Sequence, residues 1–274
     1  MRVSVIVAVY KDVEALRLII EALKGQTYKN FEVVVAEDGE NEAMGAYVKS
    51  IEGLEVKHTT QEDLGVRKAR SQNNAVLASG GEYLIFIDGD CVPYSTFVEG
   101  HVALAEKGKV LSGRRVNLPK KLSEMVKNKK VLSMEIEKKP WKYWYLFFDK
   151  EARFKQGIRL DPKGALYKIL SKRSPCASIL GCNFSCFKKD MVEINGFDES
   201  YGETAIPDDM DLDWRFRAKG LALKSCKNSA NMFHLWHMIH DRGDATKEVL
   251  CMEVRKSKKE YFCSNGLNLH NLNC

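Results

Sequence analysis

The sequence predicts an α/β domain built around a largely parallel, doubly wound sheet. Three runs of apolar, mostly β-branched or aromatic residues, at Val3–Val9, 31–36 and 83–87, are typical of strands covered on both faces. Segments with helical spacing of apolar residues separate these runs. Strands that alternate with helices in this way favour parallel pairing, because each helix carries the chain back across the sheet.

The helices and shorter strands follow from the same patterns. Asp12 can cap a helix in which apolar residues recur at helical spacing from Val13 to Leu23. Gly80-Gly81 ends a helical pattern that begins at Arg67. The other expected elements are a helix at 42–51, a strand at 54–58, a further sheet segment at 178–187, a helix from Asp208 and a helix at 246–261.

The composition is that of a soluble globular protein. The chain has 274 residues, of which 45% are hydrophobic and 29% are charged. This composition excludes a collagen, a coiled-coil array and a largely disordered protein. The longest apolar runs fall well short of the ~18 residues that span a bilayer, and Met1-Arg2 leads directly into the first strand. We therefore expect no transmembrane segment and no signal peptide. The eight cysteines include no C-x-x-C pair, so we expect reduced thiols and a cytoplasmic location.

The net charge of +6 is unevenly distributed along the chain. Residues 119–174 hold 16 Lys and Arg against 6 Asp and Glu, together with many aromatic residues. Such a basic, aromatic block suits an anionic membrane surface or a nucleic acid. The alternative is a solvated helical insertion whose aromatic side chains pack inward. We expect a sheet domain at 1–118 and 176–242, a basic, mainly helical insertion at 119–175, and a C-terminal helix and tail at 243–274.

Polar residues follow the three main predicted strands, where open α/β sheets bind their ligands. These segments are 8–12, Glu37-Asp38-Gly39 and Asp88-Gly89-Asp90. Two carboxylates separated by a glycine suit a hard divalent cation such as Mg²⁺ or Mn²⁺, although an acidic turn without a ligand has the same sequence. Neither G-x-G-x-x-G nor a P-loop is present, which argues against a dinucleotide oxidoreductase and an NTPase.

Two further clusters carry candidate chemistry. Four carboxylates lie within 208–213, where Asp209 and Asp213 would share one helix face and Asp213 could pair with Arg217. They can simply favour the helix dipole, but crowding also raises the pKa of a carboxyl group toward that of a general base. Three histidines lie within 234–240. Because imidazole binds Mn²⁺ or Zn²⁺, we expect at least one of them to be a metal ligand.

Taken together, these segments resemble family 2 glycosyltransferases, the inverting, sugar-nucleotide-dependent enzymes with the GT-A fold. The resemblance is closest to bacterial polymerase-like and galactosyltransferase-related members, and it covers 1–113 and 176–242. The similar segments, in order, are the opening strand at 3–10, Leu23 to Val33 with Gln26-Thr27, Glu37-Asp38-Gly39, 64–70, the D-x-D motif Asp88-Gly89-Asp90, Gly181-Cys182-Asn183, Gly196-Phe197-Asp198-Glu199 and Asp208-Asp209. Asp208 stands where the family usually has Glu.

The resemblance implies a role for each of these positions. It makes 1–118 the nucleotide-sugar-binding part of the domain and 176–242 the acceptor-binding and catalytic part. The implied residues are Asp209 as catalytic base; Ala8, Tyr10, Glu37, Asp38, Arg67, Lys68, Asp88 and Gly89 for the nucleotide-sugar; Gly181, Asn183 and Asp208 for the acceptor; and Asp88, Asp90 and His234 for the metal. Roles of His237 and His240 stay open.

The implied function is metal-dependent, inverting transfer of a sugar from a nucleotide-sugar, expected to be UDP-linked, with Mn²⁺ or Mg²⁺. The acceptor would be a hydroxyl of a glycan or a lipid-linked molecule, in bacterial surface polysaccharide synthesis at the inner face of the membrane. One alternative is a sugar nucleotidyltransferase, but 8–12 lacks the glycine-rich phosphate loop of that class. The other is a nucleic-acid-binding protein that uses the basic insertion. We expect no nucleic-acid partner.

Overall fold

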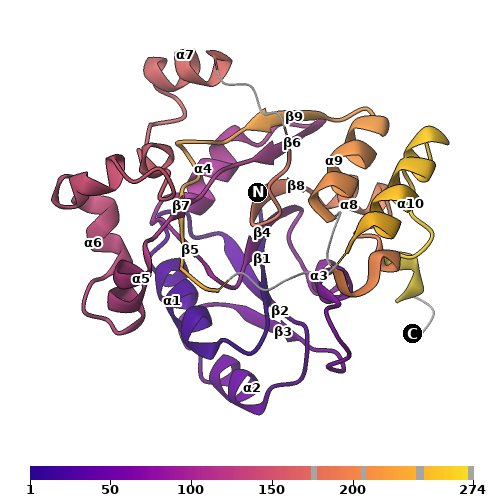
Figure 1. The fold of residues 1–274 in the computed structure, drawn as a ribbon, viewed down its shortest axis with the longest axis horizontal. Coiled ribbons are helices and arrows are strands. Elements are labelled where there is room, and N and C mark those ends of the chain that lie inside the picture. The colour runs from indigo at the N-terminus through magenta and orange to yellow at the C-terminus, as the bar shows by residue number, and fades with distance from the viewer. Residues whose placement is uncertain (174–177, 205–207, 239–243, 271–274) are drawn as a thin grey trace.

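A seven-stranded mixed sheet forms the centre of the computed structural model, which describes residues 1–173, 178–204, 208–238 and 244–270 (Figure 1). The strand order is β3-β2-β1-β4-β8-β6-β9. Their bounds are β1 Val3–Val9, β2 Phe31–Glu37, β3 Val56–Thr59, β4 Tyr83–Asp88, β6 Lys109–Ser112, β8 Asn183–Phe187 and β9 Ala222–Ser225. All neighbouring pairs are parallel except those of β8, which runs antiparallel to β4 and β6. The predicted, largely parallel sheet is therefore confirmed.

Both faces of this sheet are covered, as the doubly wound prediction requires. Odd-numbered residues of β1, such as Val5, pack in a core shared with α1 and α2, whereas Ile6 packs with α3, α8 and α9. This alternation follows from the two-residue period of a strand. The covering helices are α1 Val13–Lys24, α2 Glu42–Lys49, α3 Lys68–Ala78, α4 Phe97–Leu104, α8 Lys188–Glu193 and α9 Asp208–Ala218. The helix α10 (Thr246–Ser257) packs on the outer side of α9 (Figure 1).

The carboxyl ends of β1, β2 and β4 are aligned by their register. Ala8 pairs with Asp88 on one side, and Val9 pairs with Glu37 on the other. The polar residues after these strands are therefore brought to one edge of the sheet. A second sheet of β5 (Cys91–Pro93), β10 (Met232–His234) and β7 (Val116–Asn117) lies beyond this edge. It brings residues that are far apart in the sequence next to Asp90.

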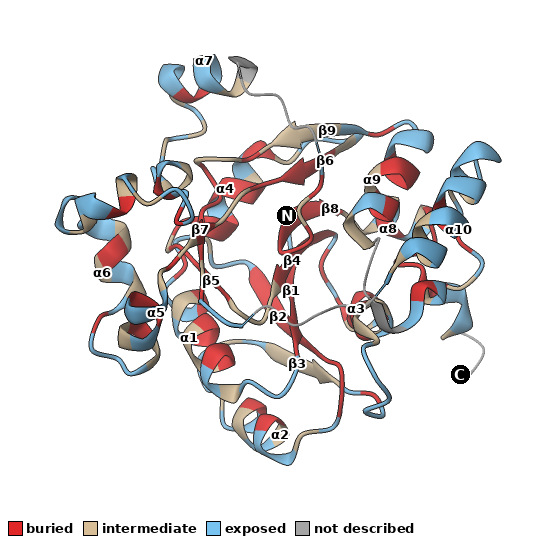
Figure 2. Ribbon diagram, viewed as in Figure 1, coloured by how far each residue is buried: buried red, intermediate tan, exposed pale blue. Residues whose placement is uncertain are grey.

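The basic insertion is helical and shares the main core. Its elements are α5 Lys120–Lys127, α6 Ser133–Lys138, the 3-10 helices η1 Pro140–Phe147 and η2 Phe154–Gly157, and α7 Ala165–Arg173. Val126, Ile136, Leu146 and Phe154 are buried in the same cluster as the strand β1. The inward packing considered for the aromatics thus holds for Phe154 and Tyr167 but not for all of them, since Trp141, Trp144, Tyr145 and Phe148 are exposed. Most of the surface of α7 is exposed as well (Figure 2).

The elements that the sequence predicted are present, and the largest differences are at β8, which begins at Asn183 where residue 178 was expected, and at the C-terminal helix. It was expected to reach residue 261, but α10 ends at Ser257 because Lys259 adopts a positive φ of 58° that no α-helix accommodates. None of the helices in the described ranges is long and apolar enough to cross a membrane. The six cysteines that the structure describes are free thiols, as predicted.

Candidate active site

A cavity of about 500 Å³ opens at the carboxyl edge of the sheet, a size typical of small-molecule sites. Seven of the residues predicted to bind the nucleotide-sugar or the metal line it, namely Ala8, Tyr10, Asp38, Lys68, Asp88, Gly89 and Asp90. The sequence had given no role to most of the others, which include Asp12, Gly65, Val66, Ser71, Lys127, Leu235, Trp236 and His237. The cavity therefore gathers residues from β1, β4, α3, the insertion and the segment after β10.

Gly89 allows the two carboxylates of the D-x-D motif to flank the end of β1. A Cβ atom at this position would lie 2.8 Å from the backbone oxygen of Ala8, so a larger residue would push the turn out of place. Asp88 accepts a hydrogen bond from Lys68 Nζ at 2.6 Å. Burial alone would lower the pKa of Lys68, but Asp88, Asp209 and Asp208 raise it, so this ammonium group stays charged.

Asp38 is the fixed acidic group at the β2 end of the cavity. Its Oδ1 accepts a hydrogen bond from Gln61 Nε2 at 2.7 Å, and its Oδ2 accepts one from the backbone N–H of Arg67 at 2.7 Å. The guanidinium of Arg67 instead donates to the backbone oxygen of Glu62 and does not line the cavity. Glu37 is buried away from it and accepts a hydrogen bond from the backbone N–H of Asn41. Of the acidic pair, only Asp38 faces the candidate ligand.

Asp90 meets two histidines at the opposite side of the cavity. Antiparallel pairing of β10 with β5 sets His234 opposite Cys91, and so beside Asp90. The Oδ2 atom of Asp90 lies 3.3 Å from His234 Nε2 and 3.1 Å from His237 Nε2. Burial alone would raise the pKa of Asp90, but hydrogen bonds from both histidines hold it well below its usual range.

The donor atoms of Asp90, His234 and His237 all lie within 4.8 Å of one another, an arrangement that can hold a metal ion. Because Mg²⁺ takes almost only oxygen ligands, two imidazoles favour a transition metal such as Mn²⁺. One carboxylate and two imidazoles leave positions free for oxygen atoms of a bound molecule. The residues present therefore fit a divalent cation. Asp88 bonds to Lys68 instead, and His240 lies outside the described residues.

The insertion contributes directly to this site. Lys127 of α5 lines the cavity, and its Nζ lies 3.0 Å from Asp12 Oδ2. The hydroxyl of Ser123 accepts a hydrogen bond from the backbone N–H of Trp236 at 2.8 Å, and Lys120 Nζ lies 4.7 Å from the centre of the Trp236 ring. Helix α5 thus supports the segment that carries His237. No motif in the sequence marked this contact.

Asp209 is held against the loop before β8. Its Oδ2 accepts a hydrogen bond from the backbone N–H of Gly181 at 2.9 Å, and one turn later Asp213 accepts one from Ile179 at 3.0 Å. A Cβ atom at position 181 would collide with the Asp209 carboxylate. Asp209 and Asp213 therefore share a helix face, as predicted, and Asp213 also pairs with Arg217. The glycine contributes a backbone donor that orients the candidate base.

Asp208 has the raised pKa that carboxylate crowding led us to expect in this cluster. Burial is the main cause and raises its pKa to about 6; Lys68 lowers it, whereas Asp209, Asp211 and Asp88 raise it further. Asp208 and Asp209 are therefore close enough to the Lys68–Asp88 pair to act in one electrostatic unit. Neither Asp208 nor Asp209 is among the residues that line the cavity.

The side chain of Asn183, which was predicted to bind the acceptor, has a structural role instead. It is fully buried, and its amide nitrogen donates hydrogen bonds to the backbone oxygens of Arg114 and Ala230 at 2.8 and 3.0 Å. Its Oδ1 lies 3.1 Å from Nε2 of His101, and burial lowers the pKa of this histidine to about 3, which keeps it neutral. The side chain of Asn183 thus fastens β8 to its neighbours and does not line the cavity.

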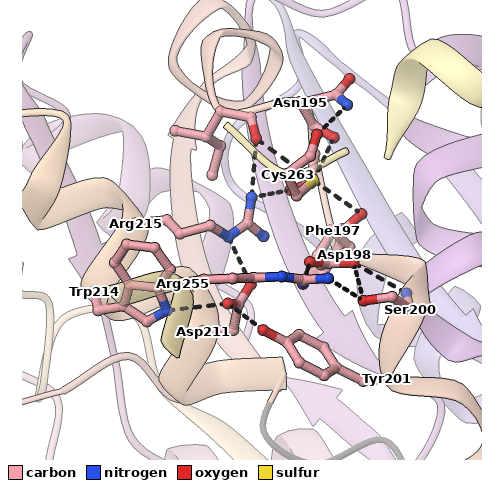
Figure 3. Close-up of polar contacts among 12 residues, drawn as sticks. Asn195, Phe197, Asp198, Ser200, Tyr201, Asp211, Trp214, Arg215, Arg255 and Cys263 are labelled. Carbon is pink, nitrogen blue, oxygen red and sulfur yellow. Dashed lines mark hydrogen bonds and ion pairs between the residues drawn. The ribbon is translucent and has the colours of Figure 1, made fainter. Parts of the chain in front are cut away.

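A buried polar network fixes α9 and therefore the position of Asp209 (Figure 3). Asp211 accepts hydrogen bonds from Arg215 Nε at 2.6 Å, Tyr201 Oη at 2.7 Å and Trp214 Nε1 at 3.0 Å. Arg215 is 1% exposed and also donates to two backbone oxygens in the turn before Phe197. Beside this group, Arg255 of α10 pairs with Asp198 of the same turn. Helix α10 thus supports the outer side of α9.

We expect Asp211→Asn to lower the free energy of unfolding by about 3–5 kcal/mol, because it leaves the Arg215 charge buried without its counterion. Asp213→Asn is the matched control, since the Asp213–Arg217 pair has the same spacing on the same helix but Arg217 is 47% exposed. For this variant we expect a loss of at most about 1 kcal/mol. Urea unfolding measures both, and an equal loss in the two variants would contradict the role of the buried network.

Comparison with known proteins identifies the family. The sequence matches the family described as "Glycosyl transferase family 2" over residues 4–167, more than half of the chain. The chain belongs to glycosyl transferase family 2. Among curated relatives, it is 34% identical over 91 residues to the glycosyltransferase GlyA of Streptococcus pneumoniae, which is 32% of this chain and 13% of that protein. It is 32% identical over 122 residues to the glycosyltransferase AglE of Haloferax volcanii, 42% of this chain and 37% of that protein. The chain thus spans about an eighth of the first relative and little more than a third of the second.

Solved structures show the same fold. The chain superposes on S. aureus TarS 1-349 in complex with UDP-GlcNAc with a TM-score of 0.59 and 14% identity, covering 94% of this chain and 66% of that one. For the mannosyltransferase PcManGT of Pyrobaculum calidifontis, in complex with GDP-Man and Mn²⁺, the TM-score is 0.56 with 15% identity, covering 94% and 62%. For GalNAc-T7 with UDP, GalNAc and Mn²⁺, the TM-score is 0.62 with 15% identity, and the match covers 94% of this chain and 48% of that one. This family 2 chain therefore has the predicted GT-A fold.

Proposed function

We propose that this family 2 chain transfers a sugar from a nucleotide-sugar donor to an acceptor hydroxyl, with inversion at the anomeric carbon. The observation that carries the proposal is one cavity lined by Asp38, Asp88, Lys68 and two members of the Asp90–His234–His237 cluster, with Lys68 within electrostatic range of Asp209. Such a transfer requires carboxylates that bind a ribose, a cation site that binds a diphosphate, and a positioned general base.

We assign the nucleotide to the β1 and β2 side of the cavity. Ala8 and the exposed ring of Tyr10 offer a surface for the base, and Asp38 and Asp88 offer carboxylates for ribose hydroxyls. A UDP-linked donor is our choice, and the UDP complexes of TarS and GalNAc-T7 support it. A cation, Mn²⁺ in preference to Mg²⁺, held by Asp90, His234 and His237 would supply positive charge to the departing diphosphate.

Asp209 is the proposed base. It would take the proton from the acceptor hydroxyl while the oxygen attacks the anomeric carbon on the face opposite the nucleotide, so that a single displacement inverts the centre. The hydrogen bond from Gly181 orients one carboxylate oxygen. Asp208, whose pKa is raised to about 6, lies beside it at the acceptor side. Lys68 stays protonated and pairs with Asp88 next to the donor.

The acceptor and its location complete the proposal. We take the acceptor to be a glycan or a lipid-linked molecule in surface polysaccharide synthesis, used on the cytoplasmic side of a membrane. A sugar nucleotidyltransferase is not favoured, because β1 is followed by Tyr10 and Lys11 and no glycine-rich phosphate loop.

A donor panel tests the proposal. The protein is incubated with Mn²⁺ and, in separate reactions, with UDP-glucose, UDP-galactose, UDP-GlcNAc and GDP-mannose, and the released nucleoside diphosphate is measured. We expect slow release from one UDP-sugar even without acceptor, since water can replace the acceptor hydroxyl, and no release after EDTA treatment. Release from none of the four, in protein shown to be folded, would contradict the proposed function.

A further inference from the structure

Four large aromatic side chains of the insertion form an exposed surface that the active site does not use. Trp141, Trp144, Tyr145 and Phe148, which we call the aromatic surface, are 49–78% exposed. Trp144 and Phe148 contact each other edge to face with ring centres 5.8 Å apart. Soluble proteins seldom expose so many large aromatic residues together unless the surface contacts a partner.

Helix α7 adds aliphatic side chains to the exposed part of the insertion. Leu166, Ile169 and Leu170 are 43–58% exposed and follow the spacing of one helix face. Tyr167 is buried and donates a hydrogen bond to the backbone oxygen of Ser225 at 2.9 Å. The helix thus presents apolar residues to the solvent while Tyr167 anchors it to β9. Figure 2 shows this helix largely exposed.

Basic residues are interspersed with these apolar residues along the chain. Residues 138–168 hold nine Lys and Arg against three Asp and Glu. Of the nine, Lys142 pairs with Glu135, and the other eight form no ion pair among the residues that the structure describes. These eight, all exposed, are Lys138, Lys139, Lys150, Arg153, Lys155, Arg159, Lys163 and Lys168. Residues 138–168 therefore carry a net positive charge, and among the described residues these eight side chains have no acidic partner within ion-pair distance.

We propose that the insertion docks this protein on an anionic lipid bilayer, with the aromatic surface and the outer face of α7 at the headgroup level and the unpaired lysines and arginines on the lipid phosphates. Trp and Tyr prefer this interfacial depth, and lysines near an anionic leaflet are attracted to it. A sugar-binding platform would use aromatic rings with hydrogen-bonding groups, but it has no use for exposed Leu and Ile side chains. The aliphatic residues therefore favour lipid over glycan.

Docking would also bring the catalytic cavity to the membrane. Helix α5 of the same insertion contributes Lys127 to the cavity and packs under Trp236. This last point rests on the proposed function, because it places the sugar transfer at the membrane, where a lipid-linked acceptor is found. The docking itself can be measured without donor or acceptor.

Vesicle sedimentation tests the docking. The protein is mixed with vesicles of phosphatidylcholine alone, or with 30% phosphatidylglycerol, at 50 and 500 mM NaCl. We expect binding only to the anionic vesicles at low salt. Lys138→Glu/Lys139→Glu/Lys150→Glu should weaken it about 100-fold or more, because each charge contributes about fivefold near an anionic leaflet. Trp144→Ser/Phe148→Ser should weaken binding and reduce the quenching of Trp fluorescence by brominated lipid, since Trp141 remains.

The control variant carries the same change in net charge away from the insertion. Lys49→Glu/Lys107→Glu/Lys247→Glu replaces three exposed lysines and should bind anionic vesicles nearly as well as wild type. Equal loss in both triple variants, equal binding to neutral vesicles, or no binding would overturn the proposal. So would analytical ultracentrifugation showing that the aromatic surface joins two copies of the chain. Calorimetric binding of UDP should be the same in all variants, so that failed docking and a failed glycosyltransferase assignment remain distinguishable.

Discussion

Asp209→Asn should lower the rate of sugar transfer by at least about a hundredfold while leaving donor affinity within about twofold of wild type. The substitution keeps the size of the side chain and an oxygen that can accept the hydrogen bond from Gly181, but removes the group that accepts the proton. A positioned general base contributes typically 10²–10⁴-fold to a rate. Initial rates of transfer and calorimetric binding of the donor measure the two quantities separately.

Asp213→Asn is the control for this variant. Asp213 lies one turn along the same helix face and accepts the backbone N–H of Ile179 in the same manner. We expect it to transfer sugar at close to the wild-type rate, because Asp209, and not Asp213, is among the carboxylates that raise the pKa of Lys68. Near wild-type transfer by Asp209→Asn, or an equal loss in both variants, would show that another group is the base.

Asp90→Asn and His237→Ala should each weaken Mn²⁺ binding by at least about 100-fold. Even residues that only orient a metal ligand contribute about 10–100-fold to affinity, so removal of a ligand should cost no less. Titration of Mn²⁺ followed by electron paramagnetic resonance gives the affinity directly. Thermal melts should stay near wild type for His237→Ala, because this side chain is 46% exposed.

The matched control for the metal site is Asp12→Asn. Asp12 lines the same cavity but pairs with Lys127 and lies outside the Asp90 cluster. Asparagine also caps a helix well, so α1 should keep its first turn. Mn²⁺ affinity of this variant should match wild type. If Asp12→Asn lost as much affinity as Asp90→Asn, the effect would come from the overall charge of the cavity and not from a ligand set.

Sequence reasoning located the central sheet and the D-x-D end of β4 because buried strands leave a strong local signal. Runs such as Val3–Val9 are apolar on both faces, and a glycine with no room for a Cβ marks the turn at Gly89. The apolar run and the D-x-D pattern are both local in the chain, whereas the lack of room for a Cβ at Gly89 comes from Ala8 of β1. The shared face of Asp209 and Asp213 is also local, because it follows from helical spacing.

Contacts between segments that are distant in the sequence could not be predicted from local patterns. His237 reaches Asp90 only because the short strand β10 pairs with β5, about 140 residues earlier. Lys127 lines the cavity because the insertion packs into the main core. The basic composition of the insertion did not predict this packing. Asn183 belongs to a motif that predicts acceptor contact, yet His101 and two backbone oxygens bury its side chain. Three-residue strands and tertiary packing have no periodicity that a sequence displays.

The central claim is that a cation on the Asp90–His234–His237 cluster and a nucleoside diphosphate occupy this cavity together. Calorimetric titration of UDP into the protein, with and without saturating Mn²⁺, tests it most directly. Shared coordination predicts that Mn²⁺ tightens UDP binding at least about tenfold and, by linkage, that UDP tightens Mn²⁺ binding by the same factor. Equal UDP affinity with and without Mn²⁺ would contradict the account.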